Sequence, residues 1–164
     1  MTKLEVNMQW ECVTFEQLSV QQLYEMLKLR VDVFVVEQNC PYPELDNKDL
    51  IDGVYHLIGF QKDEIIACAR LLPDGVSYET ISIGRIATKQ THRGNGLGHQ
   101  LMQSAIEHSQ TIWGESNITI GAQAHLEAFY NQHGFIKSSE VYLEDDIPHI
   151  DMIRHVDEAN ISAI

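Results

Sequence analysis

Apolar side chains recur every three or four residues in three segments of the chain, and this spacing predicts helices. The segments are residues 20–36, a stretch that begins at residue 97, and residues 124–133. Ser19 and Gln22 stand in front of the first segment as a capping-box pair. Pro41 and Pro43 cannot continue that helix, so it should end before them, and Gly134 should end the third.

Shorter segments that are rich in apolar and β-branched residues predict strands. They are residues 9–15, 54–61, 65–72, 79–88, 118–123, 135–143 and 149–156. A turn at residues 62–64 should join the second and third segments in a hairpin. Gly84, inside the fourth, indicates a β-bulge or a close approach of another backbone. The element order, β-α-β-β-β-α-β-α-β-β, predicts an α/β chain with a mixed sheet and helices on its faces.

Length and composition predict one globular domain. The chain has 164 residues, 44% of them hydrophobic, and no repeat or linker divides it. We expect a single domain with its core at about residues 8–156 and with frayed ends. The net charge of −13 disfavours nucleic acids and anionic membranes as partners, because such binding depends on clustered Lys and Arg. The acidity is expected to serve mainly solubility.

Cysteine usage and the first residues of the chain indicate a reducing compartment. Cys12, Cys40 and Cys68 are an odd number without C-x-x-C spacing, which argues against a disulfide framework and a Cys-rich zinc site. The N-terminus lacks the pattern of a signal peptide. No apolar run approaches the roughly 18 residues that a membrane-spanning helix needs. We therefore expect a soluble cytoplasmic protein.

A glycine-bearing turn, Arg93-Gly94-Asn95-Gly96-Leu97-Gly98, joins a predicted strand to a predicted helix. Its glycines leave backbone N–H groups unshielded, and the first turn of the helix adds unpaired N–H groups with a partial positive charge. Together they form a cradle for a phosphate or pyrophosphate, with Arg93 as a cation at its entrance. Gly98-His99-Gln100 lacks the Gly-Lys-Ser/Thr of a Walker A loop, and His99 stands where a dinucleotide fingerprint has its third glycine.

This turn resembles motif A of the GNAT superfamily of N-acetyltransferases through Arg93, Gly96 and Gly98. The sequence Ala128-Phe129-Tyr130-x-x-x-Gly134-Phe135 resembles motif B of that superfamily. Further stretches resemble the ElaA-like family, namely residues 29–38, 40–42, 69–73, 83–87 and 147–152. The resemblance runs from about Trp10 to Ile153. It implies a GNAT-like α/β fold, with a mixed, mostly antiparallel central sheet, a splayed strand pair and helices on both faces.

The resemblance also implies acetyl-CoA as the donor substrate and no metal. The pyrophosphate would lie on the N–H groups of residues 94–98. The pantetheine arm would lie between the strands at residues 83–88 and 118–123, bonded to backbone as an added strand is. An N–H group near Ile86 would polarise the thioester carbonyl. The donor-binding residues implied in this way are Ile86, Ala87, Thr88, Arg93, Gly94, Asn95, Gly96, Leu97 and Gly98.

Tyr130 is the expected general acid. A phenol with an ordinary pKa near 10 is protonated at pH 7 and can donate its proton to the CoA thiolate. Aromatic packing on the helix is the structural alternative for this residue. The general base stays open among several acids and histidines, of which His149 and Glu37 are favoured. His149, Asp151 and His155 share one face of a strand, but the reaction needs no metal and we expect no metal site.

The expected acceptor contacts are Arg70, Arg85 and His56, which lie in strands otherwise rich in apolar residues. A charge in such a strand needs a partner. One arginine would bind a carboxylate of the substrate, and an internal ion pair with one of the many acids is the alternative. The acidic stretches at residues 44–52 and 144–151 would draw in a cationic amine, such as a polyamine, a lysine side chain or a peptide N-terminus.

These features predict an acetyl-CoA-dependent N-acetyltransferase. It would transfer an acetyl group to a primary amine, on a small molecule or a peptide, by direct attack in a ternary complex. The alternative from another class is a non-catalytic acyl-CoA-binding sensor module, and a nucleotide-binding protein is a third hypothesis. A homodimer would be consistent with the superfamily. The identity of the acceptor is not predicted.

Overall fold

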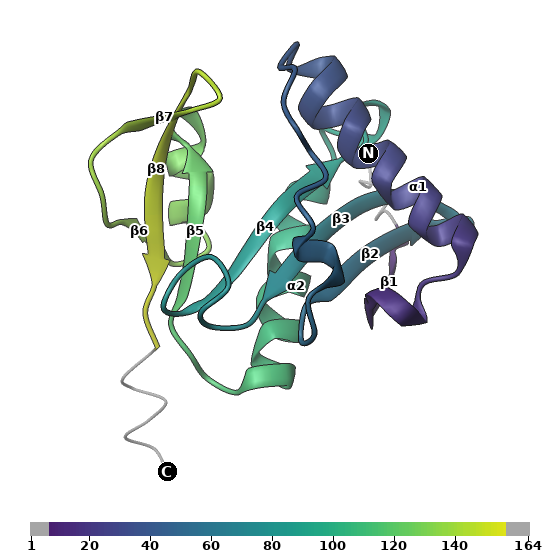
Figure 1. The fold of residues 1–164 in the computed structure, drawn as a ribbon, viewed down its shortest axis with the longest axis horizontal. Helices are drawn as coiled ribbons and strands as arrows, with labels where there is room; N and C mark the ends of the chain where they lie inside the picture. The colour runs from purple at the N-terminus through teal and green to yellow at the C-terminus, as the bar shows by residue number, and fades with distance from the viewer. Residues whose placement is uncertain (1–6, 157–164) are drawn as a thin grey trace, which may run out of the picture.

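One mixed sheet of eight strands runs through the computed structural model, which describes residues 7–156 (Figure 1). The strand order is β1-β2-β3-β4-β5-β8-β6, and β7 pairs with β8. Among the described residues, β4 and β5 form the one parallel pair. The predicted frayed ends fall largely outside this range. The strands are β1 (Gln9–Thr14), β2 (Tyr55–Gln61), β3 (Glu64–Leu72), β4 (Ile81–Thr88), β5 (Ile118–Gln123), β6 (Phe135–Lys137), β7 (Tyr142–Glu144) and β8 (Ile147–Arg154).

Helices cover both faces of the sheet, as predicted. Figure 1 shows α1 (Val20–Val31) in front of the sheet and α2 (Leu97–Trp113) behind it. The front cluster packs apolar side chains of α1, such as Met26, against β2 and β3. The rear cluster packs α2, through residues such as Leu101, against β3, β4 and β5. Within residues 7–156, no helix combines the length and the apolar character needed to cross a bilayer.

The first and third predicted helices differ in detail from the expectation. The capping box at Ser19 is present, but the α-helix ends at Val31 and the chain continues as a π-helix over Asp32–Glu37. The third helix is a 3₁₀ turn, Ala124–Leu126, followed by the short α3 (Glu127–Asn131). The segment is therefore helical as predicted, but less regular than its apolar spacing suggested.

The strand predicted at residues 135–143 is divided into β6 and β7. Lys137 pairs with Met152 of β8, whereas Tyr142 pairs with His149. Four residues, 138–141, therefore lie opposite only two residues of β8. The extra residues leave the ladder, and the predicted continuous strand is wrong at this point for that reason.

The sheet opens between β4 and β5. The two strands pair only at Ile81 with Ile118 and at Ser82 with Thr119. Beyond this point β4 stays bonded to β3 and β5 stays bonded to β8, so the two halves of the sheet diverge (Figure 1). This divergence confirms the splayed strand pair.

The predicted bulge in β4 lies next to Gly84. Ala69 of β3 faces two residues of β4, Arg85 and Ile86, because the register shifts between Cys68 and Arg70. Arg85 carries the irregular conformation, with φ of +49°. A left-handed conformation costs a residue with a Cβ about 1–2 kcal/mol, so contacts of the Arg85 side chain must hold it there.

A buried network of ion pairs holds the acidic loop at residues 44–49 against the sheet. Arg85 Nε lies 2.8 Å from Glu44 Oε2, and Arg70 Nη1 lies 2.9 Å from Asp46 Oδ1. Burial alone would raise the pKa of Asp46, but its hydrogen bonds and the charge of Arg70 outweigh burial and lower the pKa to about 2. The network, which binds the loop to α1, β3 and β4, consists of Arg30, Arg70, Arg85, Glu44, Asp46 and Asp49.

Removal of one charge from this network should destabilise the fold. Asp49 accepts hydrogen bonds from both Arg30 and Arg70. Asp49→Asn leaves these guanidinium groups short of one buried counter-charge, which should cost about 3–5 kcal/mol and lower Tm by roughly 10 °C. The control is Asp52→Asn, at an exposed position of the same segment, where we expect a change within about 0.5 kcal/mol. Equal unfolding curves for the two variants would contradict a stabilising network.

Candidate active site

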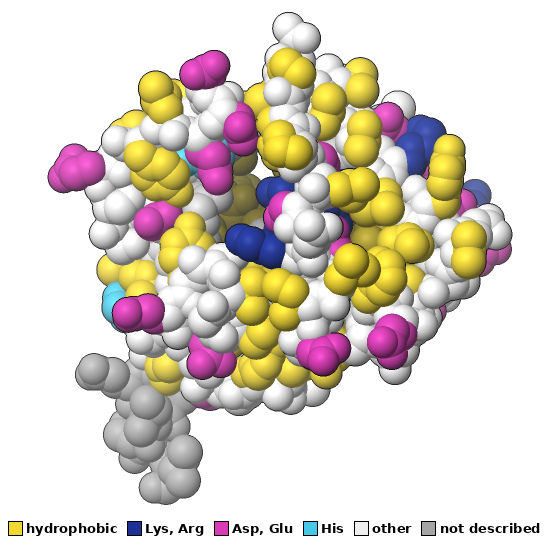
Figure 2. Space-filling model, in the orientation of Figure 1, with side chains coloured by type: hydrophobic (Ala, Val, Ile, Leu, Met, Phe, Trp, Pro, Cys, Tyr) yellow, Lys and Arg dark blue, Asp and Glu magenta, His cyan; other side chains and the backbone are white. Residues whose placement is uncertain are grey.

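A cavity of about 840 Å³ fills the opening between β4 and β5. Its walls come from both halves of the sheet, from the π-helix that follows α1 and from α3. Figure 2 shows the hollow on the face that carries α1. The predicted site residues that line it are Glu37, Arg70, Arg85, Ile86, Ala87, Thr88, Arg93, Gly98, Tyr130 and His149.

The edge of β4 that faces β5 forms one wall. From Ile83 to Thr88 this edge has no partner strand among the described residues, since the β4–β5 ladder ends at Ser82. Peptide groups on such an edge can bond an extended ligand as an added strand does. The edge includes Ile86, Ala87 and Thr88, the three residues expected to bond the pantetheine arm.

The turn in front of α2 presents backbone rather than side chains. Gly96 caps the helix with φ of +79° and no side chain bonds this N-terminus. A Cβ built on Gly94 or Gly96 would meet nothing within 4 Å, so the surface over the turn is open. A Cβ on Gly98 would lie 3.4 Å from the ring of Phe129, which is ordinary contact, so α2 and α3 meet at this residue. The open surface over Gly94 and Gly96 fits a phosphate group.

Arg93 lies between this turn and β4. Its Nη2 donates to the carbonyl oxygen of Thr88 at 2.7 Å, and its Nη1 donates to Glu37 Oε2 at 2.9 Å. These two hydrogen bonds hold the guanidinium at the entrance of the cavity, where a cation that pairs with the phosphate was expected. Glu37, one of the two favoured bases, is paired with Arg93 in this structure and orients it.

Tyr130 lies in the cavity wall and is almost fully buried. Its ring packs edge-on against Phe129 and Phe135, and its hydroxyl has no hydrogen-bond partner among residues 7–156. Burial raises the pKa of Tyr130 to about 12. The hydroxyl is therefore protonated at neutral pH and has its donor capacity free.

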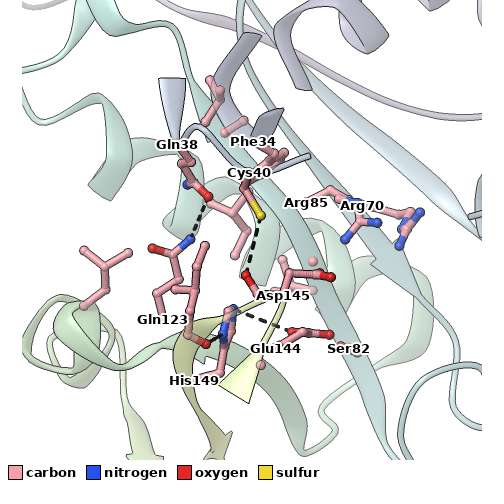
Figure 3. A pocket seen from close by; sticks show the side chains of 18 of the residues that line it. Phe34, Gln38, Cys40, Arg70, Ser82, Arg85, Gln123, Glu144, Asp145 and His149 are labelled. Carbon is pink, nitrogen blue, oxygen red and sulfur yellow. Dashed lines mark hydrogen bonds and ion pairs between the residues drawn. The ribbon is translucent and has the colours of Figure 1, made fainter. Parts of the chain in front are cut away.

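His149 stands on β8, on the other side of the opening. Its Nδ1 lies 2.7 Å from the carbonyl oxygen of Ile147, which can only accept, so Nδ1 carries the proton. In the neutral ring Nε2 then holds the lone pair. Nε2 lies 3.6 Å from Glu144 Oε2 (Figure 3). The arrangement gives the cavity wall a group that can accept a proton.

The predicted acceptor contacts are placed differently from one another. Arg70 and Arg85 line the cavity but are bound in the internal ion-pair network, as the structural alternative had it. His56 is fully buried outside the cavity wall, and its Nε2 lies 3.3 Å from the carbonyl oxygen of Asp49. Burial lowers the pKa of His56, so the ring is neutral. Its position gives no route to a substrate.

Polar contacts across the opening were not foreseen. Gln123 Nε2 of β5 donates to Gln38 Oε1 at 3.2 Å, and Cys40 Sγ lies 3.6 Å from the carbonyl oxygen of Asp145 (Figure 3). The segment after α1 therefore bridges to the β5–β8 half of the sheet. A polar residue at the end of an apolar strand, as Gln123 is, was the available sequence signal.

A second cluster of polar contacts that was not foreseen lies at the closed end of the opening. Tyr78 and Tyr142 both donate to Asp151 Oδ1, at 3.0 and 2.7 Å. A Cβ on Gly121 would lie 2.9 Å from the Tyr78 hydroxyl, so only glycine lets Tyr78 cross β5. Asp151, which shares a strand face with His149, is bound by the two tyrosines of this cluster. Residues 7–156 contain no group of three or more His, Cys, Asp or Glu side chains suited to hold a metal.

Comparison with known proteins agrees with this geometry. A family model described as an acetyltransferase (GNAT) domain matches residues 28–156. Protein ElaA of Escherichia coli strain K12 is 44% identical over 151 residues, which cover 92% of this chain and 99% of ElaA. The crystal structure of E. coli ElaA superposes with a TM-score of 0.85, at 43% identity, and covers 91% of this chain and 100% of that one.

A crystal structure described as an acyl-CoA N-acyltransferase from Pseudomonas aeruginosa is similar to the same degree. It superposes with a TM-score of 0.85, at 44% identity, and covers 90% of this chain and 99% of that one. The matched regions include the glycine turn, the splayed strands and the segment of Tyr130. The chain therefore belongs to the GNAT superfamily of acetyltransferases and, within it, to the ElaA-like family.

Proposed function

We propose that this protein is an acetyl-CoA-dependent N-acetyltransferase that acetylates a primary amine by direct attack in a ternary complex. The observation that carries the proposal is Tyr130, a protonated phenol in the wall of the opening between β4 and β5 whose hydroxyl has no hydrogen-bond partner among residues 7–156. A sensor that only bound acyl-CoA would have no use for a free proton donor at this place. Membership of the GNAT superfamily supports an acyl-CoA as the donor.

The donor would bind mostly to backbone. Its pyrophosphate would accept hydrogen bonds from the N–H groups of residues 94–98, where the helix end favours negative charge. Its pantetheine arm would run along the free edge of β4 at Ile86 to Thr88. Arg93, held by Thr88 and Glu37, would add a positive charge beside the phosphates. Backbone dipoles let a chain with a net charge of −13 bind an anionic donor.

The reaction would need one proton acceptor and one proton donor. The neutral amine attacks the acetyl carbon, the C–N bond forms and the C–S bond breaks. The amine loses one proton, and the thiolate of CoA gains one from the Tyr130 hydroxyl. The side chain of Tyr130 is then reprotonated, so that acetyl-CoA and amine give the acetamide and CoA thiol. Positioning of the two substrates would supply much of the rate enhancement.

His149 is the base that the geometry favours. Its Nε2 lone pair lies in the cavity wall, and its Nδ1–H is fixed by the carbonyl oxygen of Ile147. Glu37, in contrast, is engaged with Arg93 near the donor entrance. We therefore assign proton removal to His149, directly or through a water molecule, and the orientation of Arg93 to Glu37.

Loss of the Tyr130 hydroxyl should impair turnover. Tyr130→Phe keeps the ring packing and should lower kcat by about 100-fold or more, since general acids contribute that much, with little change in acetyl-CoA affinity. The value of kcat is measured from steady-state CoA release with the best amine of a screen. Tyr24→Phe, on the exposed face of α1, is the matched control. An unchanged kcat would remove Tyr130 from the mechanism.

A side chain on the glycine turn should weaken donor binding. Gly96→Val puts a β-branched residue on an open surface where phosphate should approach, and we expect Kd for acetyl-CoA to rise at least about 10-fold, measured by calorimetry. Val is also strained at positive φ, so Gly75→Val is the control, with φ of +88° and equally open space on the loop before β4, at the other end of that strand from the glycine turn. If both variants bind acetyl-CoA as the parent does, the cradle is elsewhere.

Kinetic measurements on two variants should show which of the two candidate residues is the base. His149→Gln should lower kcat at neutral pH, because the group that accepts the proton of the amine is gone. Glu37→Gln releases Arg93 and should mainly raise KM for acetyl-CoA. The opposite pattern, a fall in kcat for Glu37→Gln and normal turnover for His149→Gln, would transfer the role of base to Glu37.

A further inference from the structure

The part of the cavity next to β4 and the acidic loop carries cationic and hydroxyl donors that the proposed chemistry does not use. Lys48, Arg85 and Ser82 all line this part. It lies at the closed end of the opening, whereas the glycine turn follows the far end of β4. Ser82 and Thr88 are six residues apart on β4, which is about 20 Å along a strand. These donors are therefore distinct from the phosphate cradle.

Lys48 is a cation of the cavity wall that has no carboxylate partner among residues 7–156. Its half-buried side chain donates to Ser77 Oγ at 2.8 Å, and no carboxylate of residues 7–156 lies within ion-pair distance of its Nζ. Its backbone N–H donates to Asp46 Oδ1 at 3.0 Å, which fixes Lys48 beside the ion-pair network. That network joins three arginines to three carboxylates and is neutral, so the charge of Lys48 stays unbalanced.

Arg85 has one terminal nitrogen to spare. Its Nε and Nη2 are bound to Glu44 and Asp46, whereas Nη1 has no hydrogen-bond partner in the described part of the chain. The guanidinium lies 5.7 Å from the ring centroid of Tyr42, so it is held on one face as well. Such an orientation leaves a fixed N–H pair available to a ligand.

Ser82 adds an unused hydroxyl. Only 4% of the residue is exposed, it lines the cavity, and its Oγ bonds to no described residue. The hydroxyl is open to the cavity rather than enclosed by protein, so it can donate a hydrogen bond to a ligand there. Ser82 stands where β4 and β5 begin to diverge.

The opposite wall has the complementary chemistry. Glu144 at the end of β7 and Asp145 on the β7–β8 turn are exposed carboxylates that line the cavity, and His149 Nε2 is a hydrogen-bond acceptor. In Figure 2 Lys and Arg side chains border the hollow on one side, with Asp and Glu side chains beside them, and further Asp and Glu side chains border it on the other side. A ligand that spans the hollow should therefore carry a positive and a negative group.

We propose that the acceptor is an amino acid, with its carboxylate bound by Lys48, Arg85 and Ser82 and its amino group on the side of His149. This inference rests on the proposed acyl transfer and names its substrate class. The contacts of Gln38 with Gln123 and of Cys40 with Asp145 close over part of the opening, which favours a small molecule over a side chain on a folded protein. A diamine would place its second cation against Lys48 and be disfavoured.

The test is a comparison of matched acceptors. Amino acids, their carboxamides and the amines left by decarboxylation are assayed with acetyl-CoA by CoA release. The carboxamide and the decarboxylated amine both lack the carboxylate and its charge-assisted hydrogen bonds. Their kcat/KM should therefore be about 10- to 100-fold lower than that of the amino acid. The carboxamide has the less basic amino group, so more of it is unprotonated, and a preference for the acid cannot arise from that difference.

Variants connect this preference to the cationic wall. Lys48→Met should raise KM for the amino acid at least about 10-fold and leave KM for acetyl-CoA and the activity on carboxamides unchanged. Ser82→Ala should have the same effect to a smaller extent. Lys137→Met, at an exposed site on β6, is the control with the same change of charge.

Each outcome of these assays either supports the inference or overturns it. Equal use of acid, amide and amine, no transfer to any amino acid, or a Lys48→Met variant that keeps its preference for the acid would overturn the inference. In those cases acetylation of another amine would leave the proposed function in place. If acetyl-CoA neither binds nor releases CoA with any amine, the proposed function fails first, and this inference fails with it.

Discussion

The ion pairs between the acidic loop and the sheet are the interaction on which the site depends. Charges removed from water cost several kcal/mol each unless they are paired with good geometry, so the loop at residues 44–49 has one favourable position. In that position Glu44 holds Arg85, through both its carboxylate and its carbonyl oxygen. The same contacts stabilise the left-handed conformation at the β4 bulge. The network thus shapes the strand that borders the cavity.

The opening in the sheet then creates two kinds of surface at one place. The edge of β4 and the turn in front of α2 present peptide groups, which bind a ligand by shape and hydrogen bonding without regard to side-chain charge. The wall around Lys48 and the wall around His149 present charged and polar side chains. Backbone surfaces of this kind suit a donor shared by a whole superfamily, whereas side-chain surfaces suit an acceptor that differs between its members.

Charge balance explains why the acidic loop does not act as the sequence suggested. Glu44, Asp46 and Asp49 were expected to attract a cationic amine, but each is paired with an arginine. The expectation that this loop draws in cations is therefore wrong for those three residues. Uncompensated charge in the cavity comes from Lys48 on one wall and from the β7–β8 turn on the other. A strongly acidic chain can in this way hold a locally positive site.

Local sequence patterns determined the element order, the helix caps and the glycine turn, because helical spacing, capping pairs and glycine conformations act within a few residues. The resemblance to superfamily motifs pointed to Tyr130 and the edge of β4, and both line the cavity. Only the tertiary structure decided which carboxylate meets Arg70 or Arg85, that Glu37 pairs with Arg93, and that His56 lies outside the cavity. Such contacts join residues far apart in the chain, and many acids compete for each arginine. Their choice follows from packing and desolvation, which a pattern along one chain does not contain.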